Sequence, residues 1–332
     1  MNGEMNNFIK LLLWITTSMT YARFISSKLP PGRFRLAALL PVLSLLPLLP
    51  WSFSSIQLRA IFFFFLTWLS LFKLLLLSFG HGPLHPSLPL PTFITISSLP
   101  IKLRDKSSPF PPLNLRSLLL GITIKTIFLS GLISLYAYKP IMHPYLLLFV
   151  YFTHMSIALE VILSIAAFFG GAVIGLDLEP QFNSPFGATS LEDYWGRRWN
   201  LMVTSILRPT VYNPVRARFG VAAGVLATFL VSGVMHELMA YYFTSEAPTW
   251  EATCYFLLHG VCLVGEKWVK GLTGVRLTPV VSGALTMVFM LVTSFWLLFA
   301  PLLRSDAEER LVEESVAALG FLKDIMGHRI QS

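Results

Sequence analysis

The sequence predicts an all-α membrane protein, a bundle of about eight or nine transmembrane helices, and two observations favour this fold class. The 332-residue chain is 55% hydrophobic and only 13% charged, and its mean hydropathy of +0.67 is far above that of soluble globular proteins. Its apolar residues also gather in stretches close to the roughly 20 residues that a helix needs to cross a bilayer. We therefore expect a single membrane-embedded domain over residues 1–332.

The apolar stretches give the expected spans in chain order. They are Phe8 to Ser26, Leu36 to Trp51, Ile56 to Phe79, Ser117 to Tyr138, Tyr145 to Leu176, Phe219 to Phe243, Trp250 to Val269 and Val280 to Leu303. The fifth stretch is longer than one crossing. It predicts a tilted helix, a kink at Gly170-Gly171, or a helix followed by a re-entrant piece.

Two polar segments separate these spans. Residues 80–116 are rich in proline and serine, which favours an extended loop in solvent. Residues 177–218 form a polar island in which Ser190 stands three residues before Asp193, the spacing of a helix N-cap. We expect an amphipathic helix from about Leu191 to Leu207 in this island.

Helical periodicity arranges the side chains of this expected helix. One face carries two aromatic and two aliphatic residues, namely Trp195, Trp199, Met202 and Ile206. Tryptophans on such a face are typical of a helix anchored in the headgroup zone of a membrane. Asn200 lies about 100° away from that face, where its amide can donate a hydrogen bond to a substrate carbonyl or oxyanion. One helix can therefore both anchor in the membrane through its tryptophans and present Asn200 to a substrate.

The pair His236-Glu237 lies inside an apolar stretch. Ionisable side chains at membrane depth are costly, so they often mark function. Burial disfavours a charged imidazolium, and a neutral His236 is able to accept a proton as a general base. A purely structural histidine bonded to a neighbouring helix is the alternative. Glu237 points about 100° away from His236 on a helix, so we do not expect the two side chains to interact.

Further ionisable residues lie deep in the predicted spans. His259, Glu160 and His154 are candidates for a proton or polar network, although a supporting or packing role is the favoured interpretation for all three. A metal site is not expected, because these histidines lack enough neighbouring ligands.

The formal net charge of +8 is spread over loops and span ends, as in the cytoplasmic loops of membrane proteins. This pattern gives no basic stripe for nucleic acid, and it favours contact with membrane lipids. The chain carries no GxSxG, Walker A or GxGxxG motif. The sequence alone thus predicts a membrane protein with a buried base, His236, near an amide donor, Asn200. The alternative that is not an enzyme is a proton-coupled transporter.

Three segments resemble a known family. The blocks SLEDYWGRRWNLMVTSILRPTVYNPV, VSGVMHELMAYY and FLLHG, together with the earlier LSLFKLLLLSFGHGPL, are similar to plant wax synthases. These are long-chain-alcohol O-fatty-acyltransferases of the membrane-bound O-acyltransferase superfamily. The resemblance covers most of the chain.

This resemblance implies a reaction and a set of residues. The reaction is the transfer of an acyl group from acyl-CoA, a co-substrate, to a hydrophobic alcohol, with no cofactor. His236 matches the catalytic histidine of the superfamily, and Asn200 matches the asparagine that accompanies it. His259 matches a further histidine whose role is unassigned. Weaker candidates for substrate binding are Trp195, Trp199, Arg197, Arg198, His259 and Glu237.

Several expectations remain open at this stage. Arg197, Arg198 or the stretch from Lys102 to Lys106 are candidates to attract the phosphates of CoA. The acceptor is a fatty alcohol, or else a sterol, or diacylglycerol in an acetyl transfer. We expect a multi-pass protein of the endoplasmic reticulum, and the sequence does not define its oligomeric state.

Overall fold

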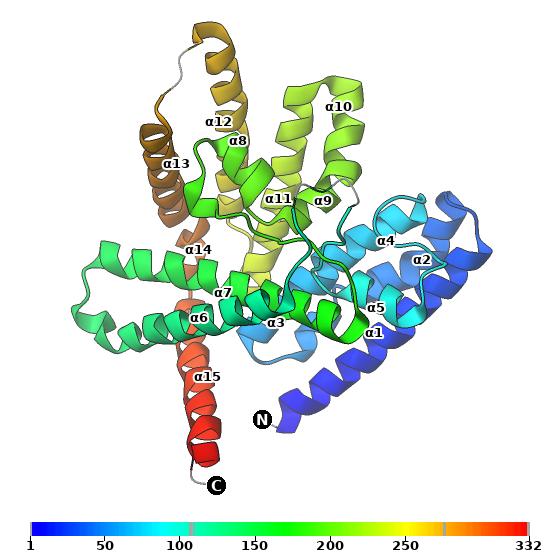
Figure 1. The fold of residues 1–332 in the computed structure, drawn as a ribbon, viewed down its shortest axis with the longest axis horizontal. Helices are drawn as coiled ribbons and strands as arrows, with labels where there is room; N and C mark the ends of the chain where they lie inside the picture. Colours follow the sequence, from blue (N-terminus) through cyan, green and yellow to red (C-terminus); the bar gives the residue numbers. More distant parts are fainter. Residues whose placement is uncertain (1, 106–107, 109, 275–276, 331–332) are drawn as a thin grey trace.

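The computed structural model describes residues 2–105, 108, 110–274 and 277–330, and this part of the chain is a bundle of helices (Figure 1). Across these residues no β-strand forms, and the β-type pairing is an isolated antiparallel bridge between Leu103 and Leu178. The predicted all-α fold is confirmed.

The N-terminal helices pack around one apolar core that includes Leu39, Leu66, Phe93 and Ile96. A π-helical stretch, η2, continues α3 into α4, so that Ile56–Ser78 runs as one helical rod. The bounds are α1 Asn2–Lys28, α2 Arg33–Leu45, η1 Leu49–Ser52, α3 Ile56–Phe62, η2 Phe63–Ser70, α4 Leu71–Ser78 and α5 Leu90–Ser98.

The remaining helices surround the polar island. In Figure 1, α6 and α7 run side by side as a long hairpin, with α10 to α13 above it in this view and most of α15 below it. The bounds are α6 Leu115–Ser134, η3 Leu135–Ile141, α7 Pro144–Ile174, η4 Pro185–Gly187, α8 Leu191–Asp193, η5 Tyr194–Arg198, α9 Leu201–Leu207, η6 Arg208–Tyr212, α10 Asn213–Phe219, α11 Val221–Thr244, α12 Glu251–Thr273, α13 Pro279–Thr293, η7 Ser294–Leu298, α14 Ala300–Leu303 and α15 Ala307–Ile330.

Six segments of the described chain are long and apolar enough to cross a membrane, rather than eight or nine. They are Arg33–Ser52, Ile56–Ser78, Leu115–Ile141, Pro144–Ile174, Val221–Thr244 and Pro279–Leu298. The first and seventh expected spans do form long helices, α1 and α12. Those two helices carry more charged residues, such as Lys10 and Arg23 in α1 and Glu266 and Lys267 in α12.

The long fifth stretch is one continuous helix, α7, and it does not break at its two glycines. A Cβ on Gly171 would lie 2.8 Å from the Leu115 side chain, and one on Gly170 would lie 3.3 Å from that of Ile101. The glycines therefore allow close packing instead of a kink. The helix ends at Gly175, whose φ of 73° is readily adopted by glycine.

Residues 80–116 are not a simple solvent loop, because α5 forms within them. Pro91 lies in the first turn of α5, where a proline costs no hydrogen bond, and Phe93 and Ile96 are fully buried. The ammonium of buried Lys73 donates to the carbonyls of Ile96 and Leu99, at 2.6 Å each. A lysine from α4 thus caps the carboxyl end of α5, where the helix dipole favours a cation.

The helix expected from Leu191 to Leu207 is broken in the structure, which corrects the prediction. Ser190 does cap its start by accepting a hydrogen bond from the Asp193 amide at 2.9 Å. The π-helical turn η5 follows α8, and the helix then stops at Trp199, which is extended. Asn200 adopts a left-handed conformation with φ 39° and begins the separate helix α9.

This break changes which residues share a face. Trp195 packs in a cluster with Phe229 and Phe256, whereas Met202 and Ile206 belong to a different cluster. The predicted common face of Trp195, Trp199, Met202 and Ile206 is therefore wrong. A period of 3.6 residues holds only along an unbroken helix, and the turn at Trp199-Asn200 redirects the chain.

The C-terminal helix α15 fastens elements that are distant in sequence. The Glu314 carboxylate accepts hydrogen bonds from the amides of Ile56 and Gln57, at 2.9 and 3.0 Å, and so caps α3. Glu308 accepts from Lys139 at 2.8 Å, and also from the Tyr151 hydroxyl. Through these two carboxylates, α15 connects the α6–α7 hairpin to the rod that contains η2.

Candidate active site

His236 lies on α11, and one of its two ring nitrogens is engaged by the protein. Nδ1 lies 2.7 Å from the backbone carbonyl of Ser232, one helical turn earlier. A carbonyl only accepts hydrogen bonds, so Nδ1 must carry the hydrogen. In neutral His236 the other nitrogen, Nε2, is therefore the unprotonated one, and no described residue hydrogen-bonds to it. The tautomer is that of a proton acceptor.

Two aromatic side chains enclose the His236 ring. The Phe256 ring of α12 lies across it, with centroids 4.2 Å apart, and Trp68 of η2 packs edge to face with centroids 5.0 Å apart. Both aromatic rings are almost completely buried. These two ring contacts hold the imidazole plane in place.

Asn200 begins α9 and is 6% exposed. Its Oδ1 accepts a hydrogen bond from the Val203 amide at 3.3 Å, as an N-cap residue does. The next amide, that of Leu201, donates to the Gln181 carbonyl at 2.8 Å. Because the Asn200 oxygen is used in the cap, its NH₂ group is the part left for a ligand, and no described residue accepts from it.

The structure brings the segments of His236 and Asn200 together without a hydrogen bond between the two side chains. Met235, which precedes His236, belongs to the same buried cluster as Met202, two residues after Asn200. Trp68 and Leu163 belong to the same cluster. The segments that carry His236 and Asn200 thus contribute neighbouring residues to one apolar core, which η2, α4, α7, α9 and α11 build together.

Glu237 is buried but faces away from His236, as the helical spacing predicts. Its Oε1 accepts from the Trp250 amide at 2.6 Å, and Oε2 accepts from the Thr253 amide at 3.2 Å. These amides belong to the start of α12, whose dipole favours a negative charge there. Glu237 therefore ties α12 to α11 and fixes the helix that carries Phe256.

His259 is fully buried on α12, and both of its nitrogens have partners. The indole N–H of Trp195 donates to Nδ1 at 3.1 Å, and Nε2 lies 2.9 Å from the Thr293 hydroxyl. An indole only donates, so the Nε2 of neutral His259 carries the hydrogen and donates to Thr293. Thr293 donates in turn to the Phe289 carbonyl at 2.7 Å. The structure places His259 as a link between η5, α12 and α13.

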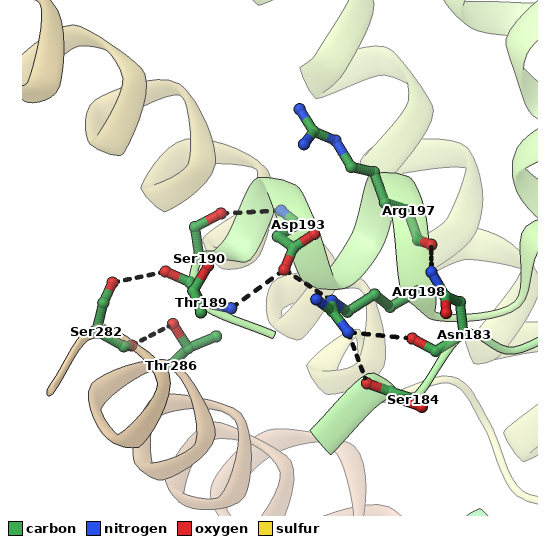
Figure 2. Close-up of polar contacts among 9 residues, drawn as sticks. All are labelled: Asn183, Ser184, Thr189, Ser190, Asp193, Arg197, Arg198, Ser282 and Thr286. Atoms are coloured by element: carbon green, nitrogen blue, oxygen red, sulfur yellow. Dashed lines mark hydrogen bonds and ion pairs between the residues drawn. The ribbon is translucent and has the colours of Figure 1, made fainter. Parts of the chain in front are cut away.

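The two arginines of the polar island have different surroundings (Figure 2). Arg198 binds Asp193 at 2.7 Å and also donates to the carbonyls of Asn183 and Ser184. Arg197 is exposed, and Figure 2 shows its guanidinium pointing away from this network. Among the described residues no ion pair or hydrogen bond engages the Arg197 guanidinium, so it is available to an anion from outside.

The basic stretch from Lys102 to Lys106 is largely paired. Lys102 lies 2.5 Å from Glu179, and Arg104 lies 3.5 Å from Asp177. Lys106 lies outside the described residues. The hydrogen bonds and the Lys102 charge outweigh the effect of burial, which alone would raise the pKa of Glu179, and they hold that pKa below its usual value.

Trp199 and the deeper ionisable residues Glu160 and His154 have partners other than His236. Trp199 stacks on Tyr194 with centroids 5.5 Å apart. Glu160 pairs with Lys125 at 2.5 Å, and His154 lies 2.5 Å from the Tyr136 hydroxyl. In the part of the chain that the structure describes, no three His, Cys, Asp or Glu residues lie close enough to hold a metal ion.

Comparison with known proteins places these residues in a family. Residues 178–258, which include Asn200 and His236, match the membrane bound O-acyl transferase family. The chain is 42% identical to probable long-chain-alcohol O-fatty-acyltransferase 3 of Arabidopsis thaliana, over 97% of each chain. It belongs to the wax synthase family. It is therefore an acyltransferase of the membrane-bound class.

Two further relatives are named for different acceptors, a long-chain alcohol and a sterol. The long-chain-alcohol O-fatty-acyltransferase of Simmondsia chinensis is 39% identical over 98% of this chain and 97% of its own length. Acyl-CoA–sterol O-acyltransferase 1 of Arabidopsis thaliana is 37% identical over 97% of each chain.

Sequence reasoning missed two residues near the site of this wax synthase family member. Trp68 contacts His236 but sits in an apolar stretch, where a tryptophan gives no pattern that marks it. Gln181 supports Leu201 through its carbonyl, while its side-chain amide donates to the carbonyls of Leu163 and Pro100. Its position near the start of the polar island was the available indication for Gln181.

Proposed function

We propose that this acyltransferase esterifies a long-chain fatty alcohol with an acyl group from acyl-CoA to form a wax ester, with His236 as the general base. The observation that carries the proposal is the tautomer of His236. Its Nδ1 hydrogen is held by Ser232, while Nε2 has no partner among the described residues and the ring packs against Trp68 and Phe256. A neutral imidazole in this form is prepared to take a proton.

The proposed reaction balances without a cofactor. Nε2 of His236 takes the hydroxyl proton as the alcohol oxygen forms a bond to the thioester carbonyl carbon, and the carbonyl π electrons move onto oxygen. The NH₂ group of Asn200 donates a hydrogen bond to that oxyanion. Collapse of the intermediate breaks the C–S bond and releases CoA thiolate, which is neutralised by the proton from His236. Exclusion of water protects the thioester from hydrolysis.

We place the polar head of CoA beside the polar island. Arg197 is exposed and has no partner among the described residues, whereas Arg198 is engaged by Asp193. A guanidinium is well suited to bind phosphate through two parallel hydrogen bonds. Arg197 is accordingly our candidate anchor for the CoA phosphates. The endoplasmic reticulum is our proposed compartment, which a fluorescent fusion with an organelle marker would test.

Esterification of a sterol is the second candidate, because one relative of 37% identity is named a sterol O-acyltransferase. The deciding assay uses membranes from a host that makes no neutral lipid, with labelled acyl-CoA and fatty alcohol, sterol or diacylglycerol as acceptor. The productive acceptor identifies the substrate. If the wild-type protein forms no ester from any of them, the proposed function is wrong and substrate transport must be tested.

The variants in this assay separate the proposed roles from folding. His236→Ala removes the base, and Asn200→Asp keeps the Oδ1 cap on Val203 but loses the NH₂ donor. We expect both variants to lose at least about 100-fold in turnover at equal expression. Full activity in either variant would exclude the role proposed for that residue.

A further inference from the structure

Trp68 combines complete burial with an unused hydrogen-bond donor. Its side chain is 1% exposed, and its indole N–H has no partner among the described residues. A buried donor without a partner destabilises the fold, and most buried polar groups have a partner. An exception beside a candidate catalytic residue points to a partner that arrives with the substrate.

The local fold places Trp68 at the site. It lies on the π-helical stretch η2, a form of helix that is rare and is frequent at functional sites. Its ring meets His236 edge to face at 83°, with centroids 5.0 Å apart. Trp68 also shares a buried cluster with Met202, which follows Asn200 in the first turn of α9.

The donors available around this cluster match the needs of acyl transfer. Sites that stabilise a tetrahedral oxyanion commonly use two hydrogen-bond donors, fixed in a place that excludes water. Asn200 offers its NH₂ group, because its oxygen is occupied by the Val203 amide. The indole of Trp68 is a donor that never accepts, so no protonation change can reverse its role.

We propose that Trp68 is the second donor to the carbonyl oxygen of the bound acyl thioester, opposite His236 and together with Asn200. This inference rests on the proposed function. As the acceptor oxygen bonds to the carbonyl carbon, the C=O π electrons move to the oxygen, and the Trp68 N–H shortens its hydrogen bond to it. Trp68 transfers no proton, since the hydroxyl proton goes to His236.

Trp195, which also packs against Phe256, does not offer the same group. The Trp195 N–H is already donated to His259 at 3.1 Å. Trp68 also lies outside residues 178–258, the part that matches the family model, so the assignment comes from its contacts alone. The proposal makes η2 a third contributor to the site beside α9 and α11.

The test replaces the Trp68 N–H while keeping the ring. In the benzothiophene analogue of tryptophan, sulfur takes the place of N–H at nearly constant volume, and Trp68→Phe is the genetically simpler companion. We expect kcat to fall about 10- to 1000-fold in both, as on loss of an oxyanion donor. The KM values for acyl-CoA and acceptor are expected to change little, because the bond strengthens mainly in the transition state.

Thermal stability separates this role from a structural one. Removing an unpartnered donor is expected to leave the Tm of the benzothiophene variant unchanged or higher. Trp195→Phe is the matched control, and its Tm is expected to fall because His259 Nδ1 loses its donor. The proposal for Trp68 would be overturned if the benzothiophene variant kept the wild-type kcat. It would also be overturned if kcat fell together with the Tm. In both cases the proposed function would stand. A wild-type protein that forms no ester would overturn both.

Discussion

Two histidines on neighbouring helices, both packed among aromatic side chains, differ in the hydrogen bonds that they can still form. His259 on α12 has both ring nitrogens engaged, by Trp195 and Thr293. His236 on α11 has only Nδ1 engaged, and the tryptophan beside it, Trp68, has an unused N–H. Both rings pack against aromatic side chains. The difference lies in the hydrogen bonds that each ring can still form: both nitrogens of His259 are used, whereas Nε2 of His236 has no partner among the described residues.

The largest effect is expected on removing the base from the histidine with the unengaged nitrogen. His236→Gln keeps a polar side chain of similar size but lacks a proton acceptor of suitable basicity. Turnover of labelled acyl-CoA is expected to fall about 100- to 10,000-fold, with little change in Tm. His81→Gln, on an exposed loop, is the control with full activity. A His236→Gln protein as active as that control would remove the distinction between the two histidines.

The opposite pattern is expected for the fully engaged histidine. His259→Ala leaves the Trp195 N–H and the Thr293 hydroxyl without this partner and creates a cavity, so about 2–5 kcal/mol of unfolding free energy is lost. The Tm in detergent measures this loss. Turnover per folded molecule is expected to fall much less than in His236→Gln. A catalytic loss equal to that of His236→Gln, at unchanged Tm, would mean that both histidines take part in the chemistry.

A smaller effect is expected at Glu237, which lies next to His236 in sequence but serves the helix that carries His259. Glu237→Gln keeps one oxygen for the two amides of α12, so one cap contact is lost, worth about 1–3 kcal/mol. The Tm reports this change, and Glu246→Gln on the exposed turn is its control. Unchanged Tm would show that the capping contacts contribute nothing.

The smallest effect lies outside both histidine sites, at the ion pair of Lys102 and Glu179. The lowered pKa of Glu179 means that its stabilising contribution is present above the usual glutamate pKa and is lost as pH falls through the folded-state value. The difference in Tm between wild type and Glu179→Gln is therefore expected to narrow between pH 6 and pH values below about 4. A difference independent of pH would contradict the lowered pKa.

The sequence predicts the features that depend on composition and on local chain geometry. Apolar stretches gave the helices, and the helical spacing correctly separated Glu237 from His236. The break at Asn200 was not predictable from periodicity, since it depends on Gln181 holding the Leu201 amide and on a left-handed residue that caps its own helix. Helical periodicity describes the faces of one unbroken helix and gives no information on contacts from other segments that end it.

Contacts between segments that are distant in the chain could not be predicted either, because local patterns do not show which helices pack together. Whether a histidine in a helix has one engaged nitrogen or two is decided by the residues that other segments bring to it. Trp195 and Thr293 hydrogen-bond to His259, whereas Trp68 packs against the His236 ring without such a bond. The helix α5 is stabilised by Lys73 from α4, and a proline-rich composition alone favoured a loop there. The roles assigned to the site residues remain predictions until the variants are assayed.

The cap on α3 has a consequence for biosynthesis. The carboxylate that satisfies the amides of Ile56 and Gln57 belongs to Glu314, which lies 258 and 257 positions further along the chain. A ribosome must therefore deliver nearly the whole polypeptide before the first turn of that early rod acquires its partner. The rod also carries Trp68, so the final arrangement around His236 is secured late, after the other helices have been inserted.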